Sequence, residues 1–221
     1  MGLTSAELDR LAAHPAVVRL LQSLAERPGV PAEVGRDVRR AAILLTMRMR
    51  DDGEPEVLMI KRADAENDPW SGHIALPGGR MEPGDADLSV TAVRETWEET
   101  GVDVARDGRM LGFLDDLMPR SPTLQPIVIR PYVALVRAEV EIVASHEVAV
   151  AFWVPLSALR STDAWGIGIV HVRGMERRVS VFRHGDYTVW GLTERVLRQF
   201  LVYVGEPPLG ESFDDDATGA R

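Results

Sequence analysis

The sequence predicts an α/β fold in which helices cover a mixed β-sheet. Segments with the alternation and β-branched content of strands are mixed with segments of helical periodicity. The two kinds do not follow the regular strand–helix–strand order of a doubly wound parallel sheet. The chain has 221 residues, of which 45% are hydrophobic, so it can bury the core of one globular domain with short additions.

The first 34 residues are expected to form a helical extension and a linker. Apolar side chains recur at helical spacing between Thr4 and Ala25, with an interruption near Pro15 and a cap at Ser5 or Thr4. The stretch "RPGVPAEVG" has the composition of a linker. The main domain is therefore expected over residues 35–204, and the Gly-, Pro- and Asp-rich tail 205–221 is expected to be disordered.

The first half of the main domain contains several predicted strands. "RRAAILLTMRM" and "EPEVLMIKR" flank the turn signal "DDG", which predicts a β-hairpin. "HIALPGG" predicts a short strand that ends in a glycine turn. "IVIRPYVALVRAEV" is also typical of a strand, and Pro131 within it predicts an edge position or a bulge.

The second half of the domain mixes strands with two helices. "VAVAFWVPLSAL" predicts a strand that leads into a short helix, and "GIGIVHV" and "RRVSVFR" predict late strands. "YTVWGLTERVLRQFLVYV" predicts a closing helix. The expected core face of that helix consists of Trp190, Leu192, Val196 and Leu197.

Composition and charge exclude several classes of function. The formal net charge of −9 argues against a nucleic-acid surface, which needs clustered positive charge. Without cysteine the chain has neither disulfides nor thiolate metal sites, and its histidines lack the spacing of a zinc site. No segment resembles a signal peptide or a membrane span, so a cytoplasmic protein that does not bind membranes is expected.

An acidic helix is predicted over Asp87–Thr100, with Asp85 or Asp87 as its N-cap and Gly101 just after its end. At about 100° per residue, Glu95, Glu98 and Glu99 share one face. The opposite side, with Val90, Val93 and Trp97, is expected to be buried.

Two interpretations of this acidic face remain open. The carboxylates are either solvated surface residues or ligands of a hard cation such as Mg²⁺ or Mn²⁺. Gly78 and Gly79, directly before the helix, favour the second interpretation. A glycine turn lets backbone carbonyls approach a cation and leaves room for a phosphate chain.

The pattern "GG…RETWEETGV" resembles the Nudix box, G-x5-E-x7-R-E-U-x-E-E-x-G-U, where U is an apolar residue. Arg94, Glu95, Glu98, Glu99, Gly101 and Val102 match its second half. Thr96 stands where an apolar residue is usual. Eight residues instead of seven separate Asp85 from Arg94, so either Asp85 or Asp87 is the acidic partner of Arg94.

The resemblance implies a Nudix-type α/β/α sandwich and a metal-dependent pyrophosphohydrolase that acts on a small nucleoside diphosphate derivative. Glu95, Glu98, Glu99 and the Gly78 carbonyl would hold Mg²⁺ or Mn²⁺. The catalytic base would be a box glutamate or an acidic residue of a later loop. Glu147, before a Trp-x-Pro strand end, matches such a position or is an exposed loop carboxylate.

Residues upstream of the box resemble the coenzyme A pyrophosphatase branch, whose signature is approximately L-L-T-x-R-[SA]-x3-R-x3-G-x3-F-P-G-G. The matching residues are Arg62, Ala63, Gly72, Pro77, Gly78 and Gly79. Leu76 replaces an aromatic residue, and Asp68 replaces the second arginine, which reverses the local charge. Coenzyme A or an acyl derivative is the first substrate hypothesis, with 3′,5′-ADP and (acyl-)phosphopantetheine as products.

The alternative functions are a Nudix hydrolase of ADP-ribose, a dinucleotide or a nucleoside triphosphate, and a non-catalytic nucleotide-sensing module. Four residues are candidates for substrate contact. Gly79 would face the phosphates, Arg62 contacts a phosphate or is a surface-strand arginine, and Trp70 stacks on a base or packs within the protein. His73 touches substrate or bonds to the backbone of its loop. A homodimer formed through the N-terminal helix is a further expectation.

Overall fold

The computed structural model describes residues 5–35, 37–66, 70–119, 125–172 and 175–206. The helices are α1 (Ser5–Ala13), α2 (Pro15–Glu26), α3 (Leu88–Thr100), α4 (Val104–Asp107), α5 (Leu156–Arg160) and α6 (Gly191–Tyr203). A 3-10 turn covers Thr162–Ala164. The strands of the first half are β1 (Arg39–Met49), β2 (Pro55–Arg62), β3 (Ile74–Ala75), β4 (Gly78–Arg80), β5 (Gly108–Phe113) and β6 (Ile127–Val136). The later strands are β7 (Val148–Pro155), β8 (Trp165–Val172), β9 (Met175–His184) and β10 (Tyr187–Trp190).

The strands form a seven-stranded mixed sheet and a smaller three-stranded sheet. The large sheet has the order β3-β2-β1-β6-β5, while β4 pairs with β1 and β7 pairs with β2. Only the β1–β6 pair is parallel among these pairings, which confirms the predicted mixed sheet. Strands β8, β9 and β10 form the second, antiparallel sheet, and β10 lies against β3.

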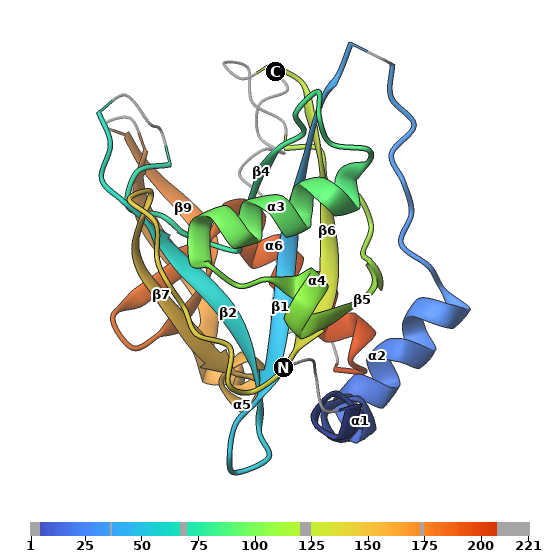
Figure 1. Cartoon of the computed structure of the whole chain (residues 1–221). Helices are drawn as coiled ribbons and strands as arrows, with labels where there is room; N and C mark the ends of the chain where they lie inside the picture. The colour runs from blue at the N-terminus through green and yellow to red at the C-terminus, as the bar shows by residue number, and fades with distance from the viewer. Residues whose placement is uncertain (1–4, 36, 67–69, 120–124, 173–174, 207–221) are drawn as a thin grey trace.

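Helices cover both faces of the large sheet, as predicted for an α/β sandwich. Figure 1 shows α3 and α4 in front of β1 and β6, and α6 behind them. The even-numbered residues Ala42 and Leu44 of β1 pack on the α3 side. The odd-numbered residues Leu45 and Met47 pack on the other side, in the core that also contains Phe200 of α6. The alternation of β1 thus supplies two cores from one strand.

The N-terminal segment folds as two helices that join this second core. Pro15 occupies the first turn of α2, where it has no hydrogen bond to break, and the helical pattern is interrupted as predicted. Val17 and Leu20 of α2 are fully buried in the same core as α6. The predicted linker lies against the domain, because Asp116 accepts a hydrogen bond from the Ala32 N–H at 2.9 Å. Of the two residues proposed as the cap of this helix, Thr4 lies outside the described residues and Ser5 is the first residue of α1.

Several sequence-based expectations need correction. Pro131 does not lie in an edge strand, because β6 runs between β1 and β5. It is tolerated there because β5 ends at Phe113, opposite Tyr132, so the missing N–H falls at the end of the ladder. "HIALPGG" forms two short strands, and "YTVW" forms β10, so the closing helix begins only at Gly191. Strand β5 and helix α4 were not predicted.

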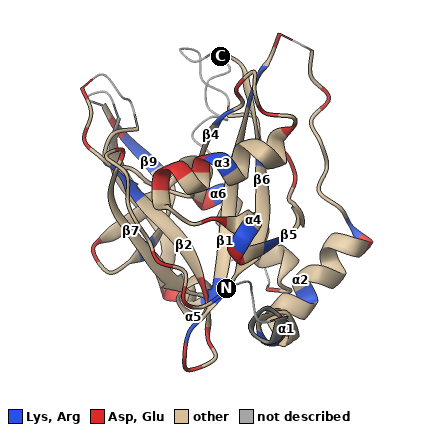
Figure 2. Ribbon diagram, viewed as in Figure 1, with Lys and Arg blue, Asp and Glu red and all other residues tan. Residues whose placement is uncertain are grey.

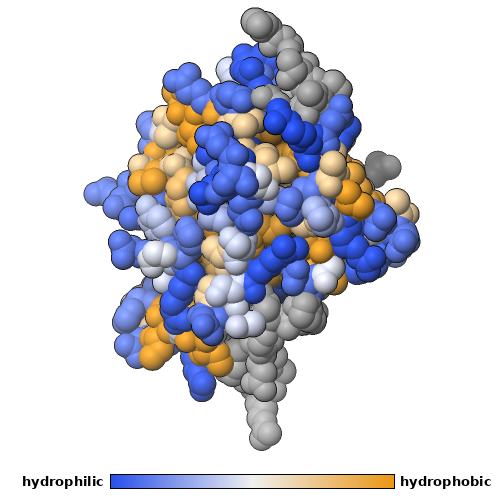
Figure 3. Space-filling view, turned by 90° about the horizontal axis from the view of Figure 1, so that it is seen from below, coloured by the Kyte–Doolittle hydropathy of each residue, from blue (hydrophilic) through white to orange (hydrophobic). Residues whose placement is uncertain are grey.

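None of the helices in the described part of the chain has the length and apolar character that a membrane crossing needs. Figure 3 shows one face of the molecule, on which hydrophobic residues form separate patches among hydrophilic ones. The homodimer, and the division into residues 1–34, 35–204 and 205–221, stay predictions. The tail from residue 207 lies outside the described residues.

Candidate active site

Helix α3 is positioned by the caps that the sequence contains. The Asp87 side chain accepts hydrogen bonds from the backbone N–H groups of Ser89 and Val90, so Asp87 is the N-cap and Asp85 is not. At the other end Gly101 has a φ of 71°, in the left-handed region, and its N–H bonds to the Trp97 carbonyl. The predicted bounds of the acidic helix are thereby confirmed.

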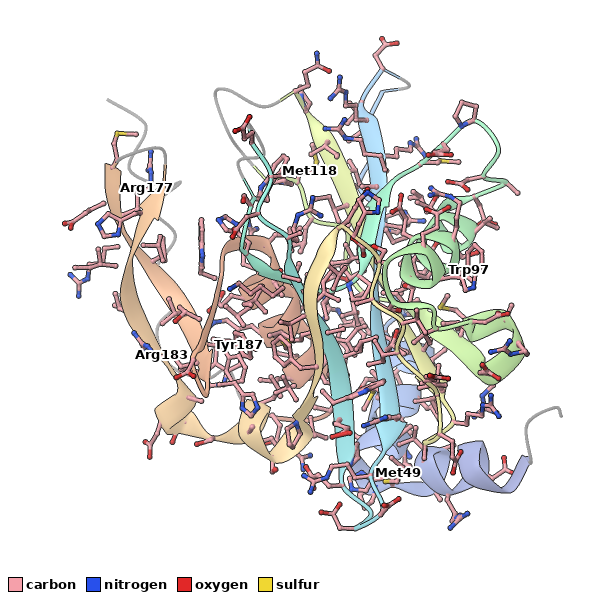
Figure 4. The ribbon with its side chains drawn as sticks, turned by 60° about the vertical axis from the view of Figure 1, so that its left-hand side comes forward. Met49, Trp97, Met118, Arg177, Arg183 and Tyr187 are labelled. Atoms are coloured by element: carbon pink, nitrogen blue, oxygen red, sulfur yellow. The ribbon has the colours of Figure 1, made fainter. Side chains whose placement is uncertain are left out.

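The buried face of α3 differs from the predicted one. Val90 and Trp97 are 42% and 57% exposed, and Figure 4 shows Trp97 on the side of α3 away from the sheet. The residues of α3 that are buried are Leu88, Thr91, Ala92, Thr96, Glu99 and Thr100. The hydroxyls of Thr96 and Thr100 donate to the carbonyls of Ala92 and Thr96, so these polar residues are satisfied inside the helix.

Arg94 takes Asp85 as its acidic partner, which settles the choice left open between Asp85 and Asp87. Its Nε donates to Asp85 Oδ1 at 3.0 Å and its Nη2 to Asp85 Oδ2 at 2.9 Å, a bidentate pair. Thr91 and the Glu82 N–H also donate to this carboxylate. The Arg94 hydrogen bond holds the pKa of Asp85 well below its usual range. The extra residue of the motif is accommodated before the helix begins at Leu88.

Arg94 also contacts two of the three glutamates among the candidate metal ligands. Its Nη1 donates to Glu95 Oε1 at 3.0 Å and to Glu98 Oε2 at 2.9 Å. The Glu98 side chain is 48% exposed, whereas that of Glu95 is 18% exposed. Within the described part of the chain, no group of three or more histidine, aspartate and glutamate side chains is gathered as an ion's ligand set. The predicted acidic face is present, and the positive group that pairs with Glu95 and Glu98 in the structure is Arg94.

The glycine turn lies directly against this face. Gly79 pairs with Ala42 on the α3 side of β1, and a Cβ placed on Gly79 would collide with the carboxyl group of Glu95. Gly78 has a φ of 152°, and a Cβ there would collide with the backbone of Ala42 and Ile43. Gly78 therefore requires glycine, whereas a side chain at Gly79 would displace the Glu95 carboxyl group, which lies directly against it.

Glu99 is the most buried of the three glutamates. Its Oε2 accepts a hydrogen bond from the Gly78 N–H at 2.9 Å, and its Oε1 lies 3.9 Å from Nη1 of Arg62. Burial raises the pKa of Glu99 to about 7, although the Gly78 N–H and the Arg62 guanidinium act in the opposite direction. Burial likewise raises the pKa of Glu95. For both carboxylates the effect of burial outweighs that of the neighbouring guanidinium groups, a chemistry that fits an additional divalent cation.

Glu147 lies at the same site on an adjacent element. Its negative charge contributes to the raised pKa values of both Glu95 and Glu99. Its carbonyl accepts the Ala63 N–H, so Glu147 is held beside the end of β2 that carries Arg62. The Ser145 N–H donates to the Glu99 carbonyl, which ties the same loop to α3. The structure thus brings Arg62, Glu95, Glu99 and Glu147 together.

The other loop candidates are placed differently. His73 packs edge-on against Trp190 with ring centroids 4.6 Å apart, and its backbone bonds to Trp70 and Arg62. The ring contact with Trp190 is neither of the two roles predicted for His73, which were substrate contact and a bond to the backbone of its loop. Trp70 is 41% exposed in the loop before β3. Asp68, where the coenzyme A signature has an arginine, lies outside the described residues.

Thr91 is a supporting residue that the sequence did not reveal. It is fully buried, and its hydroxyl donates to Asp85 at 2.9 Å. Its position one helical turn before Arg94 and Glu95 can be seen in the sequence. Without knowing which aspartate pairs with Arg94, however, that position suggests no partner for a threonine.

Comparison with known proteins places this arrangement in a family. Residues 38–184 match the family model of the NUDIX domain. The chain belongs to the Nudix family. It is 30% identical over 171 residues to the uncharacterized Nudix hydrolase NudL of Cronobacter sakazakii, covering 77% of this chain and 85% of that protein. It is 32% identical over 161 residues to NudL of Yersinia pestis, covering 72% and 77% respectively.

A solved structure shows the same fold. The MutT/nudix family protein from Enterococcus faecalis matches with a TM-score of 0.51 and 16% identity, over 95% of this chain and 79% of that one. The chain is therefore a Nudix hydrolase, an enzyme of the pyrophosphohydrolase class, as the box predicted. Members of this family generally use divalent metal ions.

Proposed function

We propose that this Nudix hydrolase cleaves the diphosphate of coenzyme A or an acyl-coenzyme A. The products would be 3′,5′-ADP and phosphopantetheine or its acyl derivative. The observation that carries the proposal is the position of the signature residues. Arg62 lies 3.9 Å from Glu99, and the Pro77–Gly79 turn donates from Gly78 to the same carboxylate. The segment that resembles the coenzyme A signature therefore adjoins the acidic face.

The proposed cofactor is Mg²⁺ or Mn²⁺, held by Glu95, Glu98, Glu99 and the Gly78 carbonyl. The exposed Glu98, the partly buried Glu95 and the buried Glu99 supply the oxygen donors that these ions prefer. When bound, such an ion neutralises diphosphate charge and lowers the pKa of a coordinated water. Arg94 would orient Glu95 and Glu98 through the hydrogen bonds that it makes to both.

The remaining roles are assigned to residues at the rim of the site. Glu147 is the proposed base, because it is exposed and close enough to perturb Glu95 and Glu99. Glu98 and Glu99 are the alternative bases within the box. Arg62 would contact a substrate phosphate, and the exposed Trp70 would stack on the adenine. His73 would support the loop from beneath through its contact with Trp190.

A substrate panel tests the proposal directly. Purified protein is incubated with coenzyme A, acetyl-coenzyme A, ADP-ribose, NADH, a diadenosine polyphosphate and nucleoside triphosphates, with Mg²⁺ or Mn²⁺, and the products are separated. The proposal predicts the highest kcat/KM for coenzyme A or its thioester, with 3′,5′-ADP as a product. Far faster turnover of any other panel member would reject coenzyme A as the substrate.

The same assay tests the alternative that the protein is a non-catalytic module that senses a nucleotide. Glu99→Gln keeps the size of a buried side chain but removes its charge, so it should lower kcat/KM by about 100-fold or more. If Glu99→Gln hydrolyses every substrate as fast as the wild type does, the assigned metal site is wrong. If wild-type protein binds a panel nucleotide and cleaves none of them, the sensing module is the better description.

A further inference from the structure

Three arginines at one end of the large sheet, Arg39, Arg40 and Arg80, have no ion pair with any described residue, and two of them, Arg39 and Arg80, share one face of the sheet. Arg39 begins β1 and Arg80 ends β4, and both are exposed. Figure 2 shows basic residues in blue near the upper end of β4 and on α3, where acidic residues in red are also present. Other arginines near the site are engaged, as Arg94 is with Asp85 and Arg130 is with Asp116 at 2.7 Å.

The register of β1 and β4 puts the two arginines on the same face of the sheet. Arg80 lies opposite Ala41, and Arg39, two residues before Ala41, projects to the same side. Residues in such a diagonal relation have Cα atoms about 7–8 Å apart, so two guanidinium groups can reach one anion. Gly79, opposite Ala42, faces α3 instead. The pair is therefore next to the glycine turn but on the other side of the sheet from Glu95.

Because the chain carries a net negative charge, the pair of Arg39 and Arg80 would attract an anion to this part of the surface in particular. With a formal net charge of −9, the protein as a whole repels a phosphorylated ligand. Around the acidic face, Arg94 is already neutralised by carboxylates, and Arg62 lies beside Glu99. Asp68 removes the second arginine of the coenzyme A signature. Arg39 and Arg80 are thus positive groups near the turn that no carboxylate in the described part of the chain neutralises.

Resting on the proposed function, we propose that Arg39 and Arg80 bind a second phosphate of the substrate, the 3′-phosphate monoester on its ribose. In coenzyme A only the ribose separates this monoester from the diphosphate. Arg80 directly follows the turn where the diphosphate is expected, and β4 pairs only with β1 among the described strands, so the ribose would pass the open edge of β4 to bring its 3′-phosphate to the face of the sheet that carries Arg80. Guanidinium groups bind phosphate oxygens in a bidentate manner. The pair would select nucleoside 3′,5′-bisphosphate derivatives over their 3′-dephosphorylated forms.

The test compares coenzyme A with 3′-dephospho-coenzyme A, for wild type and for the variants Arg39→Ala and Arg80→Ala. Each variant should lower kcat/KM for coenzyme A by about tenfold, mainly through KM, because the contact is remote from the reacting bond. The kcat/KM for dephospho-coenzyme A should change by less than about twofold. Arg40→Ala is the matched control. It removes the same charge one residue away, but from the α3 side of the sheet, and should not change the ratio of the two substrates.

Equal effects of Arg39→Ala and Arg80→Ala on both substrates would overturn the inference, and so would no effect on either. The proposed function would survive both results, provided that wild type still prefers coenzyme A to the rest of the panel. A binding experiment keeps the inference testable without turnover. Wild type should bind 3′,5′-ADP more tightly than 5′-AMP, and the double variant should lose that difference. Equal binding of the two nucleotides by wild type would overturn the inference even if coenzyme A is cleaved.

Discussion

Arg94 contacts three carboxylates, and its contact with Asp85 is the most sheltered. The Asp85 side chain is 4% exposed and receives two hydrogen bonds from Arg94, one from Thr91 and one from the Glu82 N–H. Glu95 and Glu98 share the remaining Arg94 nitrogen, Nη1. Asp85 therefore fixes the guanidinium, and the guanidinium in turn holds the side chains proposed to bind the cation.

Asp85→Asn should destabilise the protein by about 2 kcal/mol at neutral pH, because a buried charge-assisted pair loses its anion. The folded-state pKa of Asp85 is depressed, so its contribution is fully present above the unfolded pKa of about 3.9. It is lost as the pH falls through the folded-state value. Denaturant unfolding of wild type and variant should show a constant difference above about pH 5 and a shrinking one below it.

Asp51→Asn is a control for this experiment, because Asp51 lies exposed in the β1–β2 turn. It should leave the unfolding midpoint nearly unchanged at every pH. A difference between Asp85→Asn and wild type that stays the same down to pH 2 would show that the charge of Asp85 has no role in the pair.

At the scale of elements, the site depends on how closely β4 approaches α3. Gly79 has no side chain, and the carboxyl group of Glu95 occupies the space that a Cβ would fill. Asp87 and Gly101 fix the two ends of α3, and the Gly78 N–H joins the strand to Glu99. The close approach of β4 to α3, and the position of the Glu95 carboxyl group, thus depend on the absence of a side chain at Gly79.

Gly79→Ala should lower kcat/KM by about 100-fold while the protein stays folded. The added methyl group would displace the flexible end of Glu95, which can move, and not backbone, which cannot. Gly84→Ala, in the following loop, is the matched control because a Cβ there meets nothing within 4 Å. Steady-state kinetics with circular dichroism would check both. Full activity of Gly79→Ala would show that the position of Glu95 does not matter.

The sequence predicted α3 well at its ends and poorly on its sides. Capping residues act locally, so Asp87 and Gly101 were recognisable without tertiary information. The buried side was assigned to Val90, Val93 and Trp97 because apolar residues usually turn inward. In the structure Val93 is partly buried against the core, but Val90 and Trp97 are exposed and Thr91, Thr96 and Thr100 are buried. Hydroxyls that bond to the preceding turn make such a face possible, and no hydropathy pattern reveals it.

At the scale of the whole molecule, the N-terminal helices belong to the same core as the catalytic fold. Val17 and Leu20 of α2 are fully buried alongside Phe200 of α6. The linker after α2 is also bonded to the domain, because Asp115 accepts from the Val30 N–H at 2.9 Å and from Arg27. Although the sequence predicts these helices from their periodicity, the surface they cover depends on long-range contacts.

Val17→Ala should therefore destabilise the entire enzyme by about 2 kcal/mol, through lost burial and the cavity left behind. Val18→Ala is the matched control, since the neighbouring side chain is 37% exposed, and it should cost less than about 0.5 kcal/mol. Denaturant unfolding followed by fluorescence would measure both. If Val17→Ala left the main unfolding transition unchanged, α2 would be an independent appendage.

The difference between local patterns and long-range contacts also explains which parts of the large sheet were predictable. The β1–β2 hairpin follows from alternation around a turn, and its pairing is confirmed. The parallel pairing of β1 with β6 joins residues 88 positions apart, such as Arg39 and Ile127, which local patterns do not specify. Strand β5, "GRMLGF", was missed because its two glycines and an arginine weaken the signal of a strand.

The central claim is that the glutamates of α3 hold the divalent cation. It is tested most directly by Mn²⁺ binding, followed through the electron paramagnetic resonance signal of the free ion, for wild type and Glu99→Gln. Loss of one carboxylate should weaken Mn²⁺ binding by about tenfold or more. Glu141→Gln, an exposed change elsewhere, should bind like wild type. Equal Mn²⁺ affinity of Glu99→Gln and wild type would contradict the claim.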